Sequence, residues 1–244
     1  MLKYYKEKQK DTKVIMSADV VVVGSGPAGF GAAIAAGRLG MKTLLIEQGG
    51  CIGGMSTSGL MSHFTGTVDC PLYKEVIHRQ AEMEKRKPSE YINPEILQLV
   101  YLTMLREANV EIMLYTLVSD VIMDNGVVQG VITESKSGRR AILAKRIVDG
   151  TGDGDIAAKS GAKYFVGRES DGKMQPVTLM FKVAGVDYSR AVFSAQFRNA
   201  RQYRERRIAE PCKKNAYAAD GARFIISHIY ERRRYVQHDK RYRY

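Results

Sequence analysis

The hydrophobic pattern near the start of the chain predicts a strand, a turn, a helix and a second strand. Four β-branched residues in a row, Val20 to Val23, indicate a strand that is buried on both faces, as in a parallel sheet. The small residues from Phe30 to Leu39 predict a helix, which Gly40 ends. A second apolar run, Lys42–Ile46, predicts the next strand. We therefore interpret residues 17–50 as a βαβ unit.

Two further helices are predicted over Pro71–Lys87 and Glu95–Ala108, because apolar residues recur there at helical spacing. Asn93 is placed to cap the second of them, with Pro94 in its first turn. The predicted buried faces consist of Tyr73, Val76, Ile77 and Ala81 in the first helix and of Ile96, Leu99, Val100 and Leu102 in the second.

The segment that follows these helices predicts an antiparallel meander. Asn125-Gly126 is a strong hairpin signal, and Ser137-Gly138 is a second turn. A separate strand over Ala144–Val148 then leads into a second stretch rich in glycine.

That second stretch, "DGTGDGD" from Asp149 onward, predicts a turn followed by a helix from Ile156, with Asp155 as its cap. It also looks like a calcium loop, but Ser160 stands where the bidentate Glu would be, so no metal site is predicted. Further on, Met174–Asp187 predicts the first strand of a cap or substrate domain.

The chemistry of the first loop points to a dinucleotide. Gly24-Ser25-Gly26-Pro27-Ala28-Gly29 fits G-x-G-x-x-G at the end of the first strand. In this motif Gly24 makes the tight turn, Gly26 lets the backbone approach a pyrophosphate, and Gly29 lets the helix pack close to the strand. Glu47 follows the second strand, 18 residues beyond Gly29, where an acid can accept hydrogen bonds from a ribose.

The next stretch, Glu47–Gly66, favours FAD over a plain NAD-binding half. It reads as a long loop with glycine pairs at Gly49-Gly50 and Gly53-Gly54, which let backbone run flat against a planar ligand. The hydroxyl residues that could hydrogen-bond to such a ligand are Ser56, Thr57 and Ser58.

Taken together, three segments resemble the FAD-dependent oxidoreductases of the glutathione-reductase and fumarate-reductase superfamily. They are Gly24 to Glu47, Gly53-Gly54-Met55, and Asp149 to Ala162, and the likeness covers about residues 17 to 190. The resemblance implies a hydride or electron transfer between FAD and an unknown small-molecule substrate. NAD(P)H or an electron-transfer partner would be the other reactant.

The resemblance also implies which residues hold FAD. The pyrophosphate would lie on Gly24, Ser25, Gly26, Pro27, Ala28 and Gly29, and the adenosine ribose on Glu47 and Gln48. Gly54, Met55 and Thr57 would lie along the pyrophosphate towards the flavin, Val118 would contact adenine through its backbone, and Thr151, Gly152 and Asp153 would form the second phosphate-side loop.

Two side chains are weak candidates for catalysis. His63, at the end of the glycine-rich loop, could donate a proton near substrate, or it could be structural. Cys51 lies near the expected flavin, but it could equally be a small packing residue, because the sequence shows no redox partner for it.

The predicted fold class is α/β: a Rossmann-like FAD-binding domain with a parallel sheet plus an antiparallel β-meander, and the start of a cap domain. The expected boundaries are a basic leader at 1–16, the FAD-binding domain at 17–165 with a helical insertion at about 70–110, a partial cap domain at 166–221, and an atypical basic tail at 222–244.

The distribution of charge and the cysteine content bear on the binding partners and the compartment of the protein. The net charge is +12, but residues 190–244 carry 15 Lys and Arg against 5 Asp and Glu, whereas residues 1–189 carry 23 against 21. Nucleic acid is therefore not expected at the cofactor portion, although the Arg and Tyr of the tail leave a transfer-RNA-modifying flavoprotein as an alternative. Three cysteines without a C-x-x-C pair, and no membrane-spanning run, predict a cytoplasmic protein.

The tail carries one more expectation. From about Ala222 it shows no turn chemistry and poor periodicity, and a working family member would need more chain to complete the flavin site. We therefore expect residues 222–244 to come from a frameshift, which leaves a non-catalytic FAD-binding remnant as a further alternative.

Overall fold

A computed structural model describes residues 4–5, 8–65, 69–182 and 184–185 of the chain. The chain divides into two compact units. Unit 1 holds Met1–Gly59 and His63–Tyr164, and unit 2 holds Leu60–Ser62 and Phe165–Tyr244.

Unit 1 is built on one six-stranded sheet with the strand order β3-β2-β1-β6-β5-β4. Parallel pairs join β1 to β2, β1 to β6 and β2 to β3, and antiparallel pairs join β4 to β5 and β5 to β6. The predicted parallel sheet with an antiparallel meander is thus confirmed. The strands are β1 (Val14–Val23), β2 (Thr43–Ile46), β3 (Glu111–Met113), β4 (Leu117–Asp124), β5 (Val127–Ser135) and β6 (Gly138–Asp149).

Strand β6 belongs to both halves of the sheet. Its first part pairs antiparallel with β5, from Gly138 to Leu143, and it pairs parallel with β1 from Ala141 to Asp149. The separate strand predicted over Ala144–Val148 is therefore the second half of one 12-residue strand.

Of the two predicted hairpin turns of the meander, the first lies where predicted and the second is shifted by one residue. Asn125 and Gly126 both take positive φ, 48° and 78°, as a two-residue hairpin turn requires. The second turn lies one residue earlier than predicted, at Lys136-Ser137, because Gly138 already pairs with Ser135 as the first residue of β6.

Strand β1 begins at Val14, inside the stretch 1–16 that the sequence suggests is a leader. The extension has a partner: Val14 pairs with Ala141 and Met16 with Ile142 of β6. Residues 14–16 are therefore part of the sheet, because the length of β6 offers them backbone hydrogen bonds.

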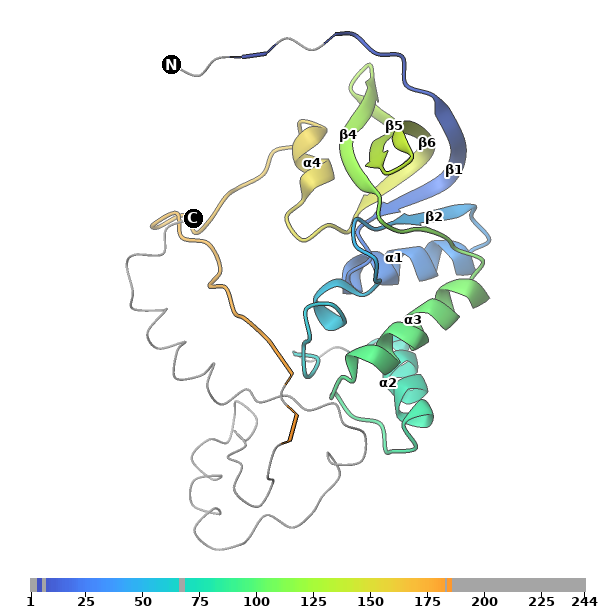
Figure 1. Ribbon diagram of the computed structural model, residues 1–244, viewed down its shortest axis with the longest axis vertical. Coiled ribbons are helices and arrows are strands. Elements are labelled where there is room, and N and C mark those ends of the chain that lie inside the picture. Colours follow the sequence, from blue (N-terminus) through green and yellow to red (C-terminus); the bar gives the residue numbers. More distant parts are fainter. Residues whose placement is uncertain (1–3, 6–7, 66–68, 183, 186–244) are drawn as a thin grey trace, which may run out of the picture. The chain divides into compact units, whose positions relative to one another are not determined.

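The helices lie close to their predicted places. They are α1 (Pro27–Arg38), α2 (Pro71–Met83), α3 (Pro94–Glu107) and α4 (Asp155–Lys159), with a short 3-10 helix η1 at Gly54–Ser56. Helix α1 starts earlier than predicted because Pro27 suits the first helical position. Figure 1 shows α1 beside β1 and β2, with α3 packed against α1 and α2.

The buried face of α3 differs from the prediction. The structure buries Leu97, Val100, Tyr101, Met104 and Leu105, whereas Leu99 is 48% exposed. The helix is apolar almost all round, so its neighbours decide which side faces inward. The ring of Tyr101 stacks on Phe30 of α1 with 3.8 Å between centroids. In α2 the buried residues are Val76, Gln80 and Ala81.

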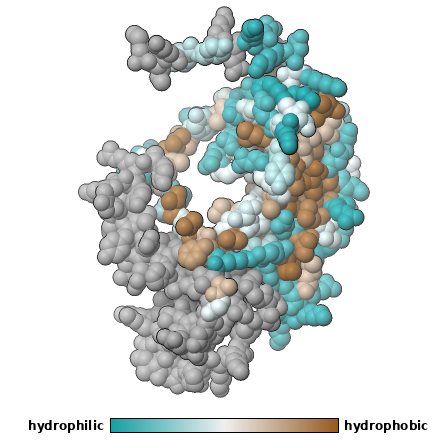
Figure 2. All heavy atoms as spheres, viewed as in Figure 1, coloured by the Kyte–Doolittle hydropathy of each residue, from teal (hydrophilic) through white to brown (hydrophobic). Residues whose placement is uncertain are grey.

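Residues of β1, β2, β4, β5 and β6 form the core of the sheet, among them Val21, Leu44, Val118, Val131 and Ile142. Figure 2 shows apolar residues gathered on the side of unit 1 that carries β1, β2 and α1. Within the described part of the chain, no helix combines the length and the apolar character needed to cross a bilayer.

In unit 2, the predicted strand Met174–Asp187 is absent over Met174–Phe181, whereas Lys182, in the same range, is in a β-bridge. An apolar pattern alone does not make a strand, because its backbone groups must also find a pairing partner. The rest of the expected cap domain and the tail at 222–244 lie outside the described residues.

Candidate functional site

Three glycines bring the ends of β1, β6 and α1 into backbone contact. A Cβ added to Gly29 would lie 1.8 Å from the carbonyl oxygen of Gly24, and one added to Gly150 would lie 2.7 Å from the Cα of Gly29. Gly24 also takes a φ of +86°. The first glycine loop and the loop after β6 are therefore adjacent, with no room for side chains between them.

Gly26 differs from these three glycines. A Cβ added there meets no atom of the described residues within 4 Å, and its φ of −60° suits any residue. Neither crowding nor backbone strain inside the chain calls for glycine here. Gly152, in the loop after β6, has the same open surroundings. Both glycines thus leave open space where a ligand could approach the backbone.

The N-terminus of α1 faces this open space. Its first helical hydrogen bond runs from the N–H of Phe30 to the carbonyl of Gly26 at 2.8 Å, so the N–H groups of Ala28 and Gly29 precede it. Within the described residues no side chain caps this end, and Pro27 supplies no N–H. Such a helix end attracts an anion such as phosphate.

The Gly53-Gly54 turn packs against the first loop. The N–H of Gly53 donates to the carbonyl of Ser25 at 2.9 Å, and a Cβ on Gly54 would lie 3.0 Å from the Cα of Gly26. Gly53 and Gly54 have φ values of +104° and +51°, so the turn needs both glycines.

Two of the hydroxyl residues that could hydrogen-bond to a ligand donate inside the chain. The hydroxyl of Thr57 donates to the carbonyl of Ile52 at 2.5 Å, and that of Ser56 to Gly53 at 2.6 Å. Both hydroxyls therefore stabilise the turn, because their donors are already used inside the chain. The side chain of Met55 is 61% exposed.

Glu47 stands at the end of β2 and is held by the first loop. Its Oε2 accepts from the N–H of Ser25 at 2.9 Å and from the Ser25 hydroxyl at 2.5 Å, and its Oε1 accepts from the N–H of Gly49 at 2.7 Å. Gln48, next to it, is exposed. The carboxylate predicted for the ribose is thus fixed beside the first glycine loop, with the remaining acceptor capacity on Oε1.

The segment between β3 and β4 runs beside Glu47. The N–H of Thr116 donates to the carbonyl of Glu47 at 3.0 Å, and that of Tyr115 to Gly49 at 3.0 Å. Val118 follows in β4 with its side chain buried in the core. Its backbone is therefore the part of Val118 that remains for a ligand.

Asp149 organises the loop after β6, a role that the sequence analysis missed. Its Oδ1 accepts from the N–H and hydroxyl of Thr151 at 3.0 and 2.6 Å, and its Oδ2 accepts from the N–H groups of Ile156 and Ala157 at 2.9 Å each. Asp155 does not cap α4 as predicted; Asp149 reaches across the loop and does so.

Burial raises the pKa of the Asp149 carboxyl, but the hydrogen bonds from Thr151, Ala157 and Ile156 outweigh it, so the pKa lies below its usual value. Asp149 therefore stays ionised and holds Thr151 in place. Gly152 and Asp153, which follow Thr151, are exposed. An acid directly at the end of an apolar strand, before a glycine turn, was the signal that could have revealed this role.

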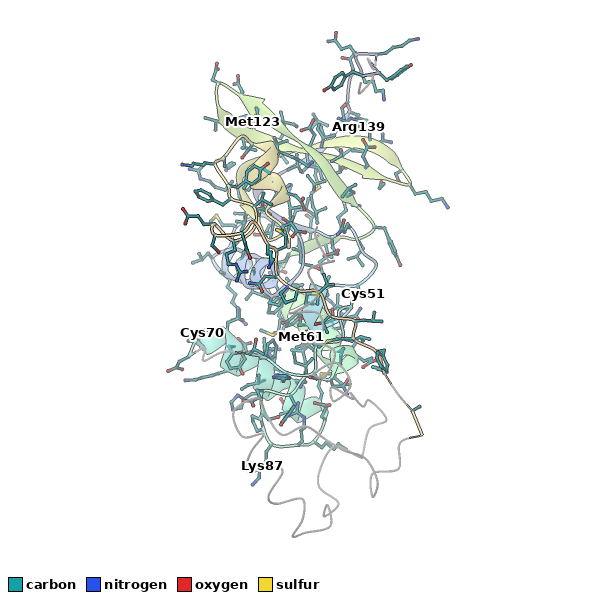
Figure 3. The ribbon with its side chains drawn as sticks, turned by 90° about the vertical axis from the view of Figure 1, so that its left-hand side faces the viewer. Cys51, Met61, Cys70, Lys87, Met123 and Arg139 are labelled. Carbon is teal, nitrogen blue, oxygen red and sulfur yellow. The ribbon has the colours of Figure 1, made fainter. Side chains whose placement is uncertain are left out.

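For the two candidate catalytic residues, His63 and Cys51, the described part of the structure shows local contacts and exposure but no catalytic arrangement. His63 forms an isolated antiparallel bridge with Tyr91. Cys51 is exposed, and Cys70 caps α2 by accepting from the N–H of Tyr73. Figure 3 shows Cys51 and Cys70 well apart. Among the described residues, no group of three or more His, Cys, Asp or Glu side chains could hold a metal ion.

Residues 19–243 match the sequence model of the family described as FAD dependent oxidoreductase. The chain belongs to this family. The match includes nearly all of the stretch 222–244 that the sequence analysis interprets as out of frame. That interpretation stays a prediction, which the nucleotide sequence of the gene tests.

Among curated relatives, the chain is similar to thiamine thiazole synthases. It is 30% identical over 118 residues to that of Aeropyrum pernix, covering 48% of this chain and 44% of the relative. It is 29% identical over 171 residues to that of Sulfolobus acidocaldarius, covering 65% and 64%. The chain thus spans less than two thirds of the length of either relative.

Among solved structures, the chain is similar to the glycerol-3-phosphate dehydrogenase from Bacillus halodurans complexed with FAD. The TM-score is 0.46 and the identity 18%, covering 61% of this chain and 37% of the other.

The residues present fit the cofactor of the family. Gly26 and Gly152 leave space for a pyrophosphate, and the N-terminus of α1 offers it N–H groups. Glu47 offers an acceptor for a ribose hydroxyl at the end of the neighbouring strand. Each part lies at the C-terminal ends of β1, β2 and β6, where α/β sheets bind dinucleotides.

Proposed function

We propose that this protein is an FAD-dependent oxidoreductase acting on a small-molecule substrate. The observation that carries the proposal is the open space at Gly26. This residue lies at the N-terminal end of α1, beside the tightly packed Gly24, Gly29 and Gly150. A pyrophosphate that approaches the backbone accounts for a glycine at a position that needs neither the room nor the conformation. Bound FAD supplies the hydride or electron transfer, as flavins do.

The residues of unit 1 would hold and orient the cofactor. The pyrophosphate would lie on Gly24–Gly29 at the start of α1, and Oε1 of Glu47 would accept from the adenosine ribose, with Gln48 beside it. The second phosphate-side loop, Thr151-Gly152-Asp153, is kept in place by Asp149. Gly54 and Met55 would continue the binding surface towards the flavin, and the backbone of Val118 would contact adenine.

The partners and the compartment follow from the same proposal. NAD(P)H or an electron-transfer partner would exchange electrons with the cofactor. Cys51 and Cys70 are free thiols, which supports a reducing compartment such as the cytoplasm. His63 and Cys51 are the side chains to test first for a part in catalysis.

The test is a direct binding measurement on the whole chain. The purified protein is examined for flavin absorbance, and the flavin-free protein is then titrated with FAD, FMN and NAD in parallel. We expect FAD to bind most tightly, because it alone combines the adenosine and flavin halves. A chain that carries no flavin and gains none when FAD is added would contradict the proposal. A bound flavin that no electron donor reduces would support FAD binding and contradict the proposed oxidoreductase activity.

A further inference from the structure

Tyr115 combines two features that its own fold does not explain. It lies between β3 and β4 with a φ of +51°, a left-handed conformation that is a genuine outlier for a bulky residue. Its side chain is nevertheless 73% exposed, so packing into the core does not account for an aromatic residue at this position. Strained conformations of this kind are concentrated at functional sites.

The backbone around Tyr115 is fastened beside the ribose-binding acid. Its own N–H donates to the carbonyl of Gly49, and the next N–H, that of Thr116, donates to the carbonyl of Glu47, each at 3.0 Å. The Thr116 hydroxyl adds a bond of 2.9 Å to the carbonyl of Leu114. Tyr115 follows the end of β3 by two residues. These hydrogen bonds hold its backbone against the Glu47–Gly49 segment.

The ring of Tyr115 extends over the backbone of Gly50. A Cβ added to Gly50 would lie 2.2 Å from the tyrosine hydroxyl oxygen and 2.4 Å from Cζ. The absence of a side chain at Gly50 thus leaves room for the ring beside the loop backbone, three residues along the chain from Glu47, while most of the ring stays open to a ligand.

We propose that the Tyr115 ring is the stacking platform for the adenine base of the dinucleotide whose ribose Glu47 binds. The inference rests on the proposed function and names a binding residue for the same ligand. A base is joined to the ribose, so it must lie within a few ångströms of the acid that holds the ribose hydroxyls. An exposed aromatic ring beside the segment that follows this acid is a surface on which a base can stack.

The test uses variants that separate the ring from its strained backbone. Tyr115→Gly removes the ring and relaxes the left-handed φ. It should therefore raise the melting temperature of the ligand-free protein. It should also lower the affinity for FAD and ADP by about tenfold, which is the loss expected when one base no longer stacks on a ring. FMN lacks adenine, so its affinity should not change. Tyr115→Phe keeps the ring and should bind FAD and ADP as the wild type does.

Two further variants act as controls. Lys85 has the same φ of +51° at the end of α2, away from Glu47, so Lys85→Gly should raise the melting temperature and leave the affinities unchanged. Gly50→Ala adds the methyl group that collides with the ring, which can swing away. It should weaken FAD and ADP and leave FMN unchanged.

The outcomes separate this inference from the proposed function. If the wild type binds FAD and Tyr115→Gly binds FAD and ADP equally well, the stacking inference is wrong and the proposed function stands. Equal weakening of FMN would show a general distortion and would also overturn the inference. A wild type that binds ADP but not FAD, with ADP weakened in Tyr115→Gly, would keep the inference and contradict the proposed function. Binding of neither ligand would overturn both.

Discussion

The Ser25 hydroxyl donates a hydrogen bond of 2.5 Å to Oε2 of Glu47, so a residue of the first glycine loop fixes the acid at the end of β2. Ser25 is 1% exposed, and its carbonyl also accepts from the N–H of Gly53. One buried serine therefore connects three segments: the first glycine loop, the end of β2 and the Gly53-Gly54 turn.

Replacing Ser25 by Ala should loosen this connection. The lost bond has a charged acceptor, so we expect the free energy of unfolding to fall by about 2 kcal/mol, with weaker FAD binding because Glu47 is less well oriented. Urea unfolding and FAD titration measure the two effects. Ser137→Ala, in an exposed hairpin turn, is the matched control and should change neither. Unchanged FAD affinity in Ser25→Ala would show that Glu47 does not need the hydroxyl.

The carboxylate of Asp149 should make the stability of the protein sensitive to acid. Burial opposes its ionisation, but hydrogen bonds from Thr151, Ala157 and Ile156 lower its pKa in the folded state. A lowered pKa adds stability that is complete above the unfolded value of about 4, and that is lost as the pH falls through the folded value.

Asp149→Asn should therefore cost about 2 kcal/mol near pH 7 and reduce the loss of stability between neutral pH and about pH 3. Urea unfolding across that range is the measurement. Asp153→Asn changes the same charge at an exposed position of the same loop and should leave the profile close to that of the wild type. If the Asp149→Asn profile is as steep as the wild-type profile, the carboxylate is not the acid-sensitive group.

Two glycines of α1 should respond in opposite ways to the same substitution. Gly29→Ala drives a methyl group to within 1.8 Å of the Gly24 carbonyl oxygen, which is backbone and has no room to move. Gly31→Ala meets only the Cδ2 atom of Leu72 at 3.8 Å, an ordinary contact. Thermal denaturation should show loss of the folded state for the first variant. The second should gain up to about 1 kcal/mol, because Ala favours the helix over Gly. Equal melting temperatures for both would contradict the packing of β1 against α1.

The sequence predicted the features that depend on neighbouring residues alone. The strand Val20–Val23, the glycine turn after it, an acid directly after β2 and the Asn93 cap all follow from local patterns, and the structure has each of these features. The Asn125-Gly126 turn is of the same kind, because the positive φ of both residues is a property of the residues themselves.

Features that depend on distant contacts were missed or wrong. The inward side of α3 was misjudged because the helix is apolar on most sides, and the stacking of Tyr101 on Phe30 selects the side that faces α1. Asp149 caps α4 from seven residues away, across a loop, whereas sequence rules look for a cap next to the helix. The use of the Ser25 hydroxyl by Glu47 likewise joins residues 22 apart.

The most direct test of the central claim is the affinity of Gly26→Ala for FAD, measured beside Gly31→Ala. The new methyl group at residue 26 meets no atom of the described chain within 4 Å, and the φ of −60° suits alanine, so the melting temperature should stay near that of the wild type. If a pyrophosphate lies against this glycine, the methyl group must weaken FAD binding by about tenfold or more, while Gly31→Ala binds FAD as the wild type does. A folded Gly26→Ala protein with wild-type affinity for FAD would show that the loop does not hold the cofactor.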